Sequence, residues 1–219
     1  YGAPERSGKQ MVTMKVLQLW RQQKHRVLLF SQTQQMLDIL EAMCATEGYN
    51  YRRMDGQTPV SQRMRLIDEF NTDDRVFVFL LTTKVGGLGV NLTGADRVLL
   101  FDPDWNPSTD AQARERAWRI GQTKEVKVYR LVTKATYEQS LFETSAKKYG
   151  LDEAVLGGGD EGGGMGSDKP GSAKDDALKI NRLLKYGVHG ALRDASGEEA
   201  AKFANEDIDD ILSKRAESR

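Results

Sequence analysis

Short apolar runs alternate with amphipathic segments along most of this chain. Four strong runs and a weaker one cover residues 26–31, 77–82, 97–102, 126–132 and, weakly, 49–54. Runs that are apolar on both faces are typical of buried parallel strands. Helical periodicity separates these runs at residues 9–22, 33–46, 59–70 and 109–119. The alternation predicts an α/β fold, a parallel sheet flanked by helices that binds ligands at the carboxyl ends of its strands.

The pattern changes after residue 135. Residues 136–150 have the periodicity of an amphipathic helix that ends at Gly150, and a glycine-rich stretch follows. Two further helical patches occupy residues 175–187 and 206–215. We therefore expect four parts: a lobe at residues 1–135, a helix at 136–156, a linker at 157–172 and a C-terminal helical extension at 173–219.

Composition narrows the class of protein. The 219 residues carry 32 Lys and Arg against 32 Asp and Glu, so any surface for a polyanion must come from local arrangement of charge. The single cysteine, Cys44, excludes disulfide scaffolds and cysteine-based zinc sites, and it fits a reducing compartment. No apolar run approaches membrane-spanning length and no signal peptide opens the chain, so we expect no membrane partner. Because the chain starts at Tyr1, we expect a piece of a longer protein.

The stretch QARERAWRIGQ at residues 112–122 holds the most informative chemistry. Arg116 and Arg119 are three residues apart, which places them on one face of a helix. Guanidinium groups match phosphate oxygens, so this pair suggests the arginine fingers of a nucleotide hydrolase. The alternative is a solvated helix face in which Glu115 is the local partner.

The segment SGK at residues 7–9 resembles only part of a phosphate-binding P-loop. A phosphate-binding P-loop needs G-x-x-x-x-G-K-[ST] between a strand and a helix, and here Gln10 follows the lysine. Ser7 is better interpreted as a helix cap. We therefore expect no phosphate cradle and no magnesium site in this chain itself.

Three loops follow predicted strands. TTKVGGLGVNLTG at residues 82–94 combines glycines, which allow close approach of the backbone to a ligand, with Lys84, which suits phosphate. In DPDWNP at residues 102–107, Trp105 either packs inside the domain or contacts nucleic acid. MDG at residues 54–56 is interpreted as a turn.

The remaining titratable groups indicate no catalytic or metal site. His25 and His189 lie in unrelated contexts without partners spaced for a metal, and both are interpreted as structural. The acidic pairs Asp73–Asp74 and Asp209–Asp210 are interpreted as solvated.

Four of these segments occur in an order that resembles a known family. RVLLFSQ (26–32), MDG (54–56), LLTTKVGGLGVNLTGADRVLLFDPDWNP (80–107) and QARERAWRIGQ (112–122) are similar to successive motifs in the second RecA-like lobe of Swi/Snf-type chromatin-remodelling ATPases. These ATPases belong to helicase superfamily two. The resemblance covers residues 8–150, and it implies a RecA-like lobe of a DNA-dependent ATPase that moves along double-stranded DNA to remodel nucleosomes.

The resemblance implies a role for each matching residue. Arg116 and Arg119 would be arginine fingers for ATP that is held, with Mg²⁺, mainly by an N-terminal RecA-like lobe of the same protein. Gly89 and Gln112 would line the nucleotide side of the cleft. The residues facing DNA, mostly toward phosphates, would be Ser31, Gln32, Thr82, Thr83, Lys84, Trp105 and Asn106. Lys84 stands where many relatives carry arginine, so its phosphate contact would lack bidentate geometry.

Further expectations follow from these roles. The helix of residues 136–156 resembles the brace that such proteins lay across the first lobe. Both arginines should lie exposed at the edge of the sheet, and this chain alone should hold no cofactor and hydrolyse no appreciable ATP.

Two subfamilies resemble different parts of the chain. DPDWNPSTDAQARERAWRIGQ (102–122) is similar to transcription-coupled-repair remodellers of the Cockayne-syndrome type. TYEQSLFETSAKKYGLDEAVL (136–156), LLKYGVHGAL (183–192) and ANEDIDDIL (204–212) resemble the region after the motor in chromodomain-helicase (CHD) and imitation-switch remodellers, and most resemble the CHD class. Because the core motifs are shared across the superfamily, the tail receives more weight and the CHD class is favoured.

The resemblance implies nuclear location and duplex DNA or nucleosomes as partners, with histones as a further possibility. Two alternatives stay open. Residues 175–215 could make the chain a regulatory or histone-docking module without motor activity of its own, or the lobe could belong to a strand-separating helicase.

Overall fold

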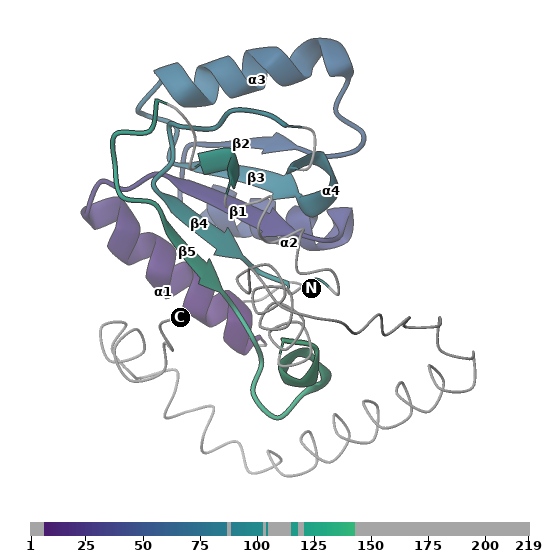
Figure 1. Cartoon of the computed structure of the whole chain (residues 1–219). Helices are drawn as coiled ribbons and strands as arrows, with labels where there is room; N and C mark the ends of the chain where they lie inside the picture. Colours follow the sequence, from purple (N-terminus) through teal and green to yellow (C-terminus); the bar gives the residue numbers. More distant parts are fainter. Residues whose placement is uncertain (1–6, 87–88, 103, 105–114, 118–120, 143–219) are drawn as a thin grey trace, which may run out of the picture. The chain divides into compact units, whose positions relative to one another are not determined.

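A computed structural model describes residues 7–86, 89–102, 104, 115–117 and 121–142 of the chain (Figure 1). Its named elements, in chain order, are α1 (Gly8–Gln22), β1 (Val27–Ser31), α2 (Gln34–Thr46), β2 (Tyr51–Met54), α3 (Val60–Thr72), β3 (Val78–Thr82), α4 (Thr83–Gly86), β4 (Arg97–Leu100) and β5 (Lys127–Arg130). The five strands form one sheet in the order β2-β3-β1-β4-β5. Every pairing in this sheet is parallel, which confirms the predicted α/β class.

Helices α1 and α2 begin where the sequence provides a capping side chain. The Ser7 hydroxyl accepts a hydrogen bond from the Gln10 amide at the start of α1, as predicted, and Thr33 caps α2 in the same way. The Lys9 ammonium donates to the Phe101 carbonyl over 2.8 Å. The SGK segment is therefore the start of a helix, in agreement with its rejection as a P-loop.

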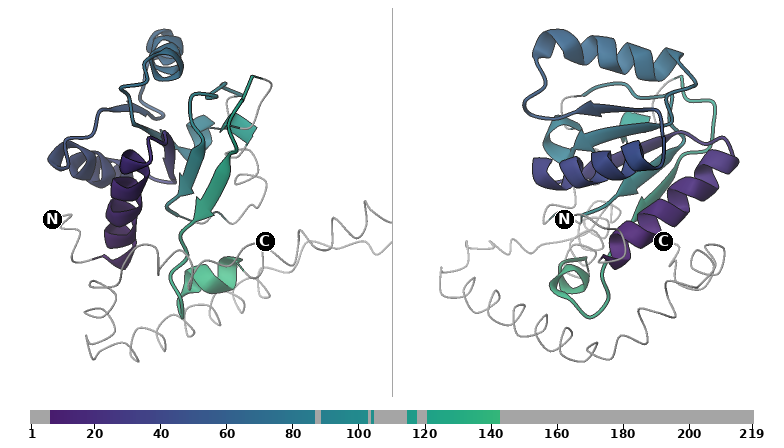
Figure 2. Two further views of the ribbon diagram at one scale, coloured as in Figure 1. Left: turned by 90° about the vertical axis from the view of Figure 1, so that its left-hand side faces the viewer. Right: turned by 180° about the vertical axis from the view of Figure 1, so that it is seen from behind.

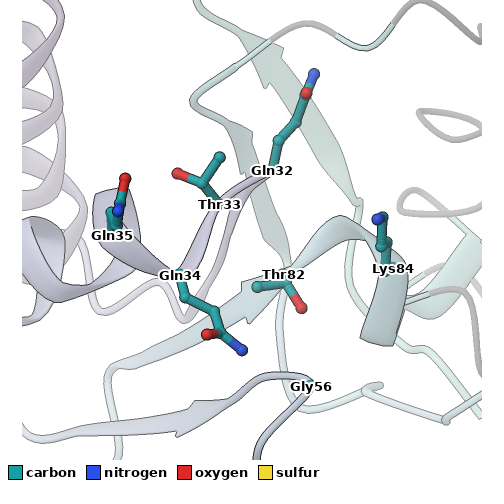
Figure 3. Close-up of a pocket in the computed structure, with 7 residues that line it drawn as sticks. All are labelled: Gln32, Thr33, Gln34, Gln35, Gly56, Thr82 and Lys84. Atoms are coloured by element: carbon teal, nitrogen blue, oxygen red, sulfur yellow. The ribbon is translucent and has the colours of Figure 1, made fainter.

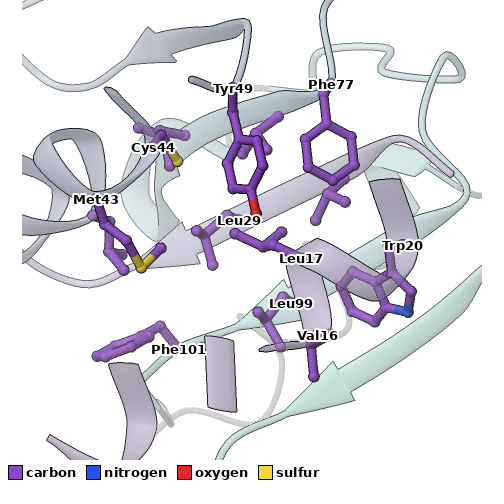
Figure 4. Packing of buried hydrophobic residues seen from close by; sticks show 14 of the residues in the cluster. Val16, Leu17, Trp20, Leu29, Met43, Cys44, Tyr49, Phe77, Leu99 and Phe101 are labelled. Atoms are coloured by element: carbon purple, nitrogen blue, oxygen red, sulfur yellow. The ribbon is translucent and has the colours of Figure 1, made fainter. Parts of the chain in front are cut away.

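Both faces of the sheet are buried, and neighbouring residues of each strand serve opposite faces. Alternate strand residues such as Leu29, Leu80 and Leu99 pack against α1 and α2 in one core cluster (Figure 4), while their neighbours join a second cluster with α3 and α4. Figure 2 shows α1 and α2 on the same side of the sheet. The buried thiol of Cys44 belongs to the first cluster, and burial raises its pKa to about 12, which confirms the prediction of a core cysteine.

Some boundaries differ from those predicted. The expected strand at residues 97–102 ends at Leu100, although the Phe101 amide still donates to the Phe30 carbonyl over 2.9 Å. The short helix α4 was not predicted, because four residues after a strand carry no helical periodicity. Residues 115–117 and 137–142 are helical, and the rest of the predicted helices at 109–119 and 136–150 lies outside the described residues. The linker at 157–172 and the extension at 173–219 also lie outside them. No described helix is both long enough and apolar enough to cross a membrane.

Asp73 and Asp74 both take part in ion pairs, which the sequence alone did not reveal. Asp73 accepts two side-chain hydrogen bonds from Arg75 over 2.9 Å each, and these hold the pKa of Asp73 down at about 2. The Asp74 carboxylate accepts from Arg26 over 3.3 Å. The Asp74 side chain is nonetheless 96% exposed, in agreement with the prediction that it is solvated, whereas the Asp73 side chain is 27% exposed.

Arg26, directly before β1, joins several segments at the amino ends of the strands. Its side chain donates to the main-chain carbonyls of Phe70, Asp73 and Val76, and the guanidinium stacks 4.4 Å from the centre of the Phe70 ring. Burial is the largest influence on this group and lowers the pKa of Arg26, against the opposing effect of nearby aspartates. The guanidinium stays protonated at physiological pH because its ordinary pKa is so high. The end of α3 is thus bonded to the start of the sheet.

Gly94 approaches this Arg26 cluster so closely that a larger residue should not fit. An added Cβ would lie 2.9 Å from the Arg26 guanidinium and 3.1 Å from the Phe70 carbonyl oxygen. We expect Gly94→Ala to lower the free energy of unfolding by about 1–3 kcal/mol, the usual effect of overpacking. Gly8→Ala is the matched control, because a Cβ there meets nothing within 4 Å. Chemical denaturation measures both, and equal stability of the two variants would contradict the close packing.

Candidate nucleic-acid interface

A hollow lies at the carboxyl edge of the sheet (Figure 3). Three chain segments form it: the link from β1 into α2, the turn after β2, and the end of β3 with the start of α4. Its volume is about 390 Å³, and its lining residues are Gln32, Thr33, Gln34, Gln35, Gly56, Thr82 and Lys84. We call these residues the carboxyl-edge hollow. They meet because parallel strands present their carboxyl ends at one edge.

The carboxyl-edge hollow is lined by neutral hydrogen-bonding groups and one cation. Amides and hydroxyls supply donors, and Lys84 is the one charged side chain in the lining. Lys84 is exposed, and no hydrogen bond or ion pair within the described part of the chain engages its ammonium group. Figure 3 shows Lys84 on α4 and Gln34 at the start of α2, with Thr82 between them. Such a lining suits an anion such as phosphate, since a lysine acts as a point charge and amides donate hydrogen bonds.

Ser31 does not line the hollow, and its side chain instead stabilises the backbone next to it. The Ser31 side chain is fully buried, and its hydroxyl donates to the Asp102 carboxylate over 2.6 Å. The same carboxylate oxygen accepts from the Gln32 amide over 3.3 Å. Asp102, which follows β4, therefore holds the backbone in place where the chain leaves β1 and begins to line the hollow. Sequence reasoning did not single out Asp102, because 70 residues separate it from Gln32.

The other residues predicted to face DNA divide into three groups. Gln32, Thr82 and Lys84 line the carboxyl-edge hollow. Thr83 is buried at the start of α4. Trp105 and Asn106 lie outside the described residues. The sequence reasoning missed Thr33, Gln34, Gln35 and Gly56, although their positions directly after two predicted strands were the signal that could have found them.

A second group of predicted residues meets at the start of the 89–95 loop. Gly89 has a backbone φ of +76°, a left-handed conformation that favours glycine, and a Cβ there would lie 3.6 Å from the Arg116 guanidinium. The Leu92 amide donates to the Arg116 carbonyl over 2.9 Å. The structure thus brings Gly89 and Arg116 together, while Gln112 and Arg119 lie outside the described residues.

The expectation that Arg116 is exposed at the sheet edge is wrong in this structure. Only 6% of Arg116 is accessible. The reason is the packing on either side: Ala117, the next residue in the chain, and Leu92 of the 89–95 loop are both fully buried in the second core cluster, which holds this helical turn against the loop. Its role as an arginine finger stays a prediction.

Gln122 fastens the same loop, a role that its sequence context did not reveal. Its side-chain amide nitrogen donates to the carbonyls of Thr93, Ala95 and Ala117 over 3.1, 2.7 and 3.0 Å. Its amide oxygen accepts from the Lys124 amide over 2.9 Å. This glutamine therefore bonds the backbone of the 89–95 loop to that of the Arg116 turn.

His25 is structural, as predicted. Its Nδ1 lies 2.6 Å from the Asp96 carboxylate and its Nε2 lies 2.9 Å from the Arg97 guanidinium. A guanidinium can only donate, so Nε2 accepts from Arg97 and the Nδ1–H donates to the Asp96 carboxylate. His189 lies outside the described residues. Within the described ranges, no group of three or more His, Cys, Asp or Glu side chains is placed to hold a metal ion.

Removing the Gln122 side chain should loosen the loop against the Arg116 turn. We expect Gln122→Ala to lower the free energy of unfolding by about 1–3 kcal/mol, because buried main-chain carbonyls lose their donor. Gln18→Ala is the control, since the Gln18 side chain makes an exposed hydrogen bond to Glu47 and should matter by less than about 0.5 kcal/mol. Thermal and urea unfolding compare the two, and a neutral Gln122→Ala would contradict the assigned role.

Comparison with known proteins extends the resemblance found in the sequence. The family described as "Helicase conserved C-terminal domain" matches residues 8–121. The DNA excision repair protein CSB of Oryza sativa subsp. japonica is 62% identical over 156 residues, which is 71% of this chain and 13% of that protein. Chromodomain-helicase-DNA-binding protein 7 of Homo sapiens is 44% identical over 210 residues, 95% of this chain and 7% of that protein. The chain thus spans a small part of the length of these relatives.

A solved structure agrees with the fold. The crystal structure of the C-terminal part of the Fun30 ATPase domain matches with a TM-score of 0.65 and 36% identity, over 81% of this chain and 53% of that one. The RecA-like arrangement of the sheet is confirmed by this match. Both Swi/Snf-type and CHD-class proteins are among the relatives, as the motifs predicted. The chain therefore belongs to the helicase conserved C-terminal domain family, and it is a C-terminal lobe of the superfamily-two kind found in remodelling ATPases.

Proposed function

We propose that this chain is the second motor lobe of a DNA-dependent ATPase that moves along double-stranded DNA to remodel nucleosomes. ATP and Mg²⁺ are bound mainly by an N-terminal RecA-like lobe of the same protein. Closure of the two lobes drives hydrolysis, and each closure shifts the DNA contacts of one lobe relative to the other. The work of such a protein on chromatin also supports a nuclear location, and it supports histones as additional partners.

The carboxyl-edge hollow is the observation that carries this proposal. It combines one exposed ammonium group, Lys84, with amides and hydroxyls, and its lining contains no carboxylate. In a RecA-like sheet this is the ligand-binding edge. Contacts of this kind favour backbone phosphates over base edges, so binding is expected to ignore base sequence and to weaken with salt.

Gly89 and Arg116 support a nucleotide-facing role for the 89–95 loop. A left-handed glycine lets the backbone approach a ligand closely, and the adjacent guanidinium can offset charge on a transferring phosphoryl group. Arg119 and Gln112 complete the proposed site. Because Arg116 is covered in this structure, lobe closure has to turn its side chain outward or bring the nucleotide to it. An arginine finger is worth roughly 10³–10⁵-fold in rate.

Salt dependence tests the DNA contact. We expect the 219-residue chain to bind duplex DNA of unrelated sequences with similar affinity, measured by fluorescence anisotropy at several salt concentrations. Lys84→Gln should weaken binding and reduce the magnitude of the log–log salt slope by ~0.9, the loss of one phosphate contact. Lys24→Gln is the control, since Lys24 is also exposed but precedes β1 at the opposite edge of the sheet.

The salt slopes of the two lysine variants test whether Lys84 contacts the DNA backbone. An unchanged slope in Lys84→Gln, or an equal change in Lys24→Gln, would place the DNA contact elsewhere on the lobe. Strong dependence on base sequence would contradict backbone binding.

Hydrolysis should require the other lobe. The 219-residue sequence has no G-x-x-x-x-G-K-[ST] loop, so we expect no appreciable ATP turnover from this chain with or without DNA. In the protein with both lobes, Arg116→Ala and Arg119→Ala should each abolish DNA-stimulated turnover while ATP binding persists. A coupled-enzyme phosphate assay measures turnover, and significant activity of the chain alone would refute its dependence on a first lobe.

A second candidate is the motor lobe of a transcription-coupled-repair remodeller. The 62% identity to the CSB protein, against 44% to chromodomain-helicase-DNA-binding protein 7, favours it, whereas the match to the latter extends over more of the chain. The two candidates share the chemistry of the lobe and differ in the task of the whole protein. Deleting the gene separates them: slower removal of ultraviolet lesions from transcribed strands supports repair, and shifted nucleosome positions alone support the CHD-type role.

The C-terminal extension has a separate proposed role. Residues 175–215, outside the described residues, would regulate the coupling of hydrolysis to movement, with the acidic DIDDIL segment (207–212) meeting a basic partner.

A further inference from the structure

Arg53 occupies an unusual position between three carboxylates. It is the third residue of the edge strand β2, and its guanidinium lies 2.6 Å from Asp38, 2.6 Å from Glu41 and 2.8 Å from Asp55. Asp38 and Glu41 belong to α2, whereas Asp55 begins the turn after β2. A single side chain thus joins a helix to a turn.

Asp55 in turn determines the shape of residues 55–58. Its carboxylate accepts from the Gln57 amide over 2.8 Å, its own amide donates to the Thr58 hydroxyl over 3.0 Å, and its carbonyl accepts from the Thr58 amide over 3.1 Å. Burial alone would raise the pKa of Asp55, but the Gln57 amide and the Arg53 guanidinium together hold that pKa below its usual value. The carboxylate is therefore charged at neutral pH and available to Arg53.

This turn is one wall of the carboxyl-edge hollow, and α2 is another. Gly56 lines the hollow, and the Gln57 side chain donates to the Gln34 side chain over 3.1 Å. Gln34, Asp38 and Glu41 lie four and three residues apart, so they share one face of α2. The face of α2 that meets the turn at the hollow thus also carries the two carboxylates that bind Arg53.

The edge position of β2 explains why such a link is needed. Among the described strands, β2 pairs with β3 alone, and that pairing reaches Met54 at its end. Within the described sheet the turn that follows has no strand on its outer side, so the sheet itself does not fix the distance of the turn from α2. Arg53, whose side chain is 21% exposed, supplies a charged, multiply bonded connection at this place.

We propose that Arg53 is a positioning residue for DNA binding: it sets the separation between the 55–58 turn and α2, and hence the width of the carboxyl-edge hollow. The proposal rests on the function proposed above. Arg53 does not itself touch the phosphate, because its guanidinium is turned to carboxylates on α2 and in the turn. It acts through the groups that line the hollow.

The strand offers a matched control in the preceding residue. Arg52 is also a partly buried arginine in an ion pair, but it donates to Glu69 of α3 over 2.7 Å, and neither residue lines the hollow. Arg53→Gln should weaken binding of duplex DNA by roughly three- to tenfold at every salt concentration, which is about 0.7–1.4 kcal/mol. Its salt slope should equal that of the parent chain, and Arg52→Gln should bind as the parent does.

A second readout does not need DNA. Hydrogen–deuterium exchange of the amides of Gln57 and Thr58 should accelerate in Arg53→Gln and stay unchanged in Arg52→Gln. Asp38→Asn offers a milder variant, since the Asp38 side chain is 63% exposed and its loss weakens the same link without altering the strand. It should change exchange and affinity in the same direction as Arg53→Gln, by less.

The binding and exchange measurements distinguish a positioning role of Arg53 from direct phosphate contact. A slope that falls by ~0.9 in Arg53→Gln, as for Lys84→Gln, would show that Arg53 contacts phosphate directly and overturn the positioning role. Parent-like affinity, or unchanged exchange at Gln57 and Thr58, would also overturn it. If the parent chain fails to bind duplex DNA, the proposed function fails, and the exchange measurement still decides whether Arg53 holds the turn.

Discussion

Parallel pairing of five short strands is the constraint on which the rest of this structure depends. With Val27 of β1 in register with Val78 and Arg97 of its neighbours, all strands start at one edge and end at the other. Parallel strands need a crossover between them, so helices cover both faces and leave only the two edges for polar chemistry. The carboxyl edge collects the loops with hydroxyls, amides and Lys84, and the amino edge collects the bonds that hold the layers together.

The two edges use charge differently. At the amino edge the buried guanidinium of Arg26 donates mainly to carbonyls, and these bonds end within the protein. At the carboxyl edge, two cationic side chains have different surroundings. Arg53 is enclosed by carboxylates, whereas Lys84 has no described partner and lies beside neutral hydrogen-bond donors. A cation whose charge is already neutralised by carboxylates can hold neighbouring segments in place. A cation without such partners can attract an anionic ligand.

The sequence predicts the fold better than it predicts the site. Apolar runs reveal the central strands β1, β3 and β4 to within a few residues, because a strand buried on both faces is largely apolar, and Ser7 marks the start of α1 by local chemistry alone. The burial of Arg116 and the bond from Ser31 to Asp102 could not be predicted in this way. Both features depend on which segments, distant in sequence, pack together. The residues next to Arg116 and Ser31 in the sequence do not indicate which segments these are.

The loop that holds Gly89 has one more consequence. Its fixed points are main-chain atoms: Asn71 binds the Asn91 carbonyl and the Gly94 amide, Gln122 binds two further carbonyls, and the Leu92 amide meets the Arg116 carbonyl. Backbone N–H and C=O groups are the same in every amino acid except proline, which has no N–H. Evolution can therefore exchange outward-facing side chains in this loop while its path stays the same, provided that Gly89, Gly94 and the two amide anchors outside the loop are kept.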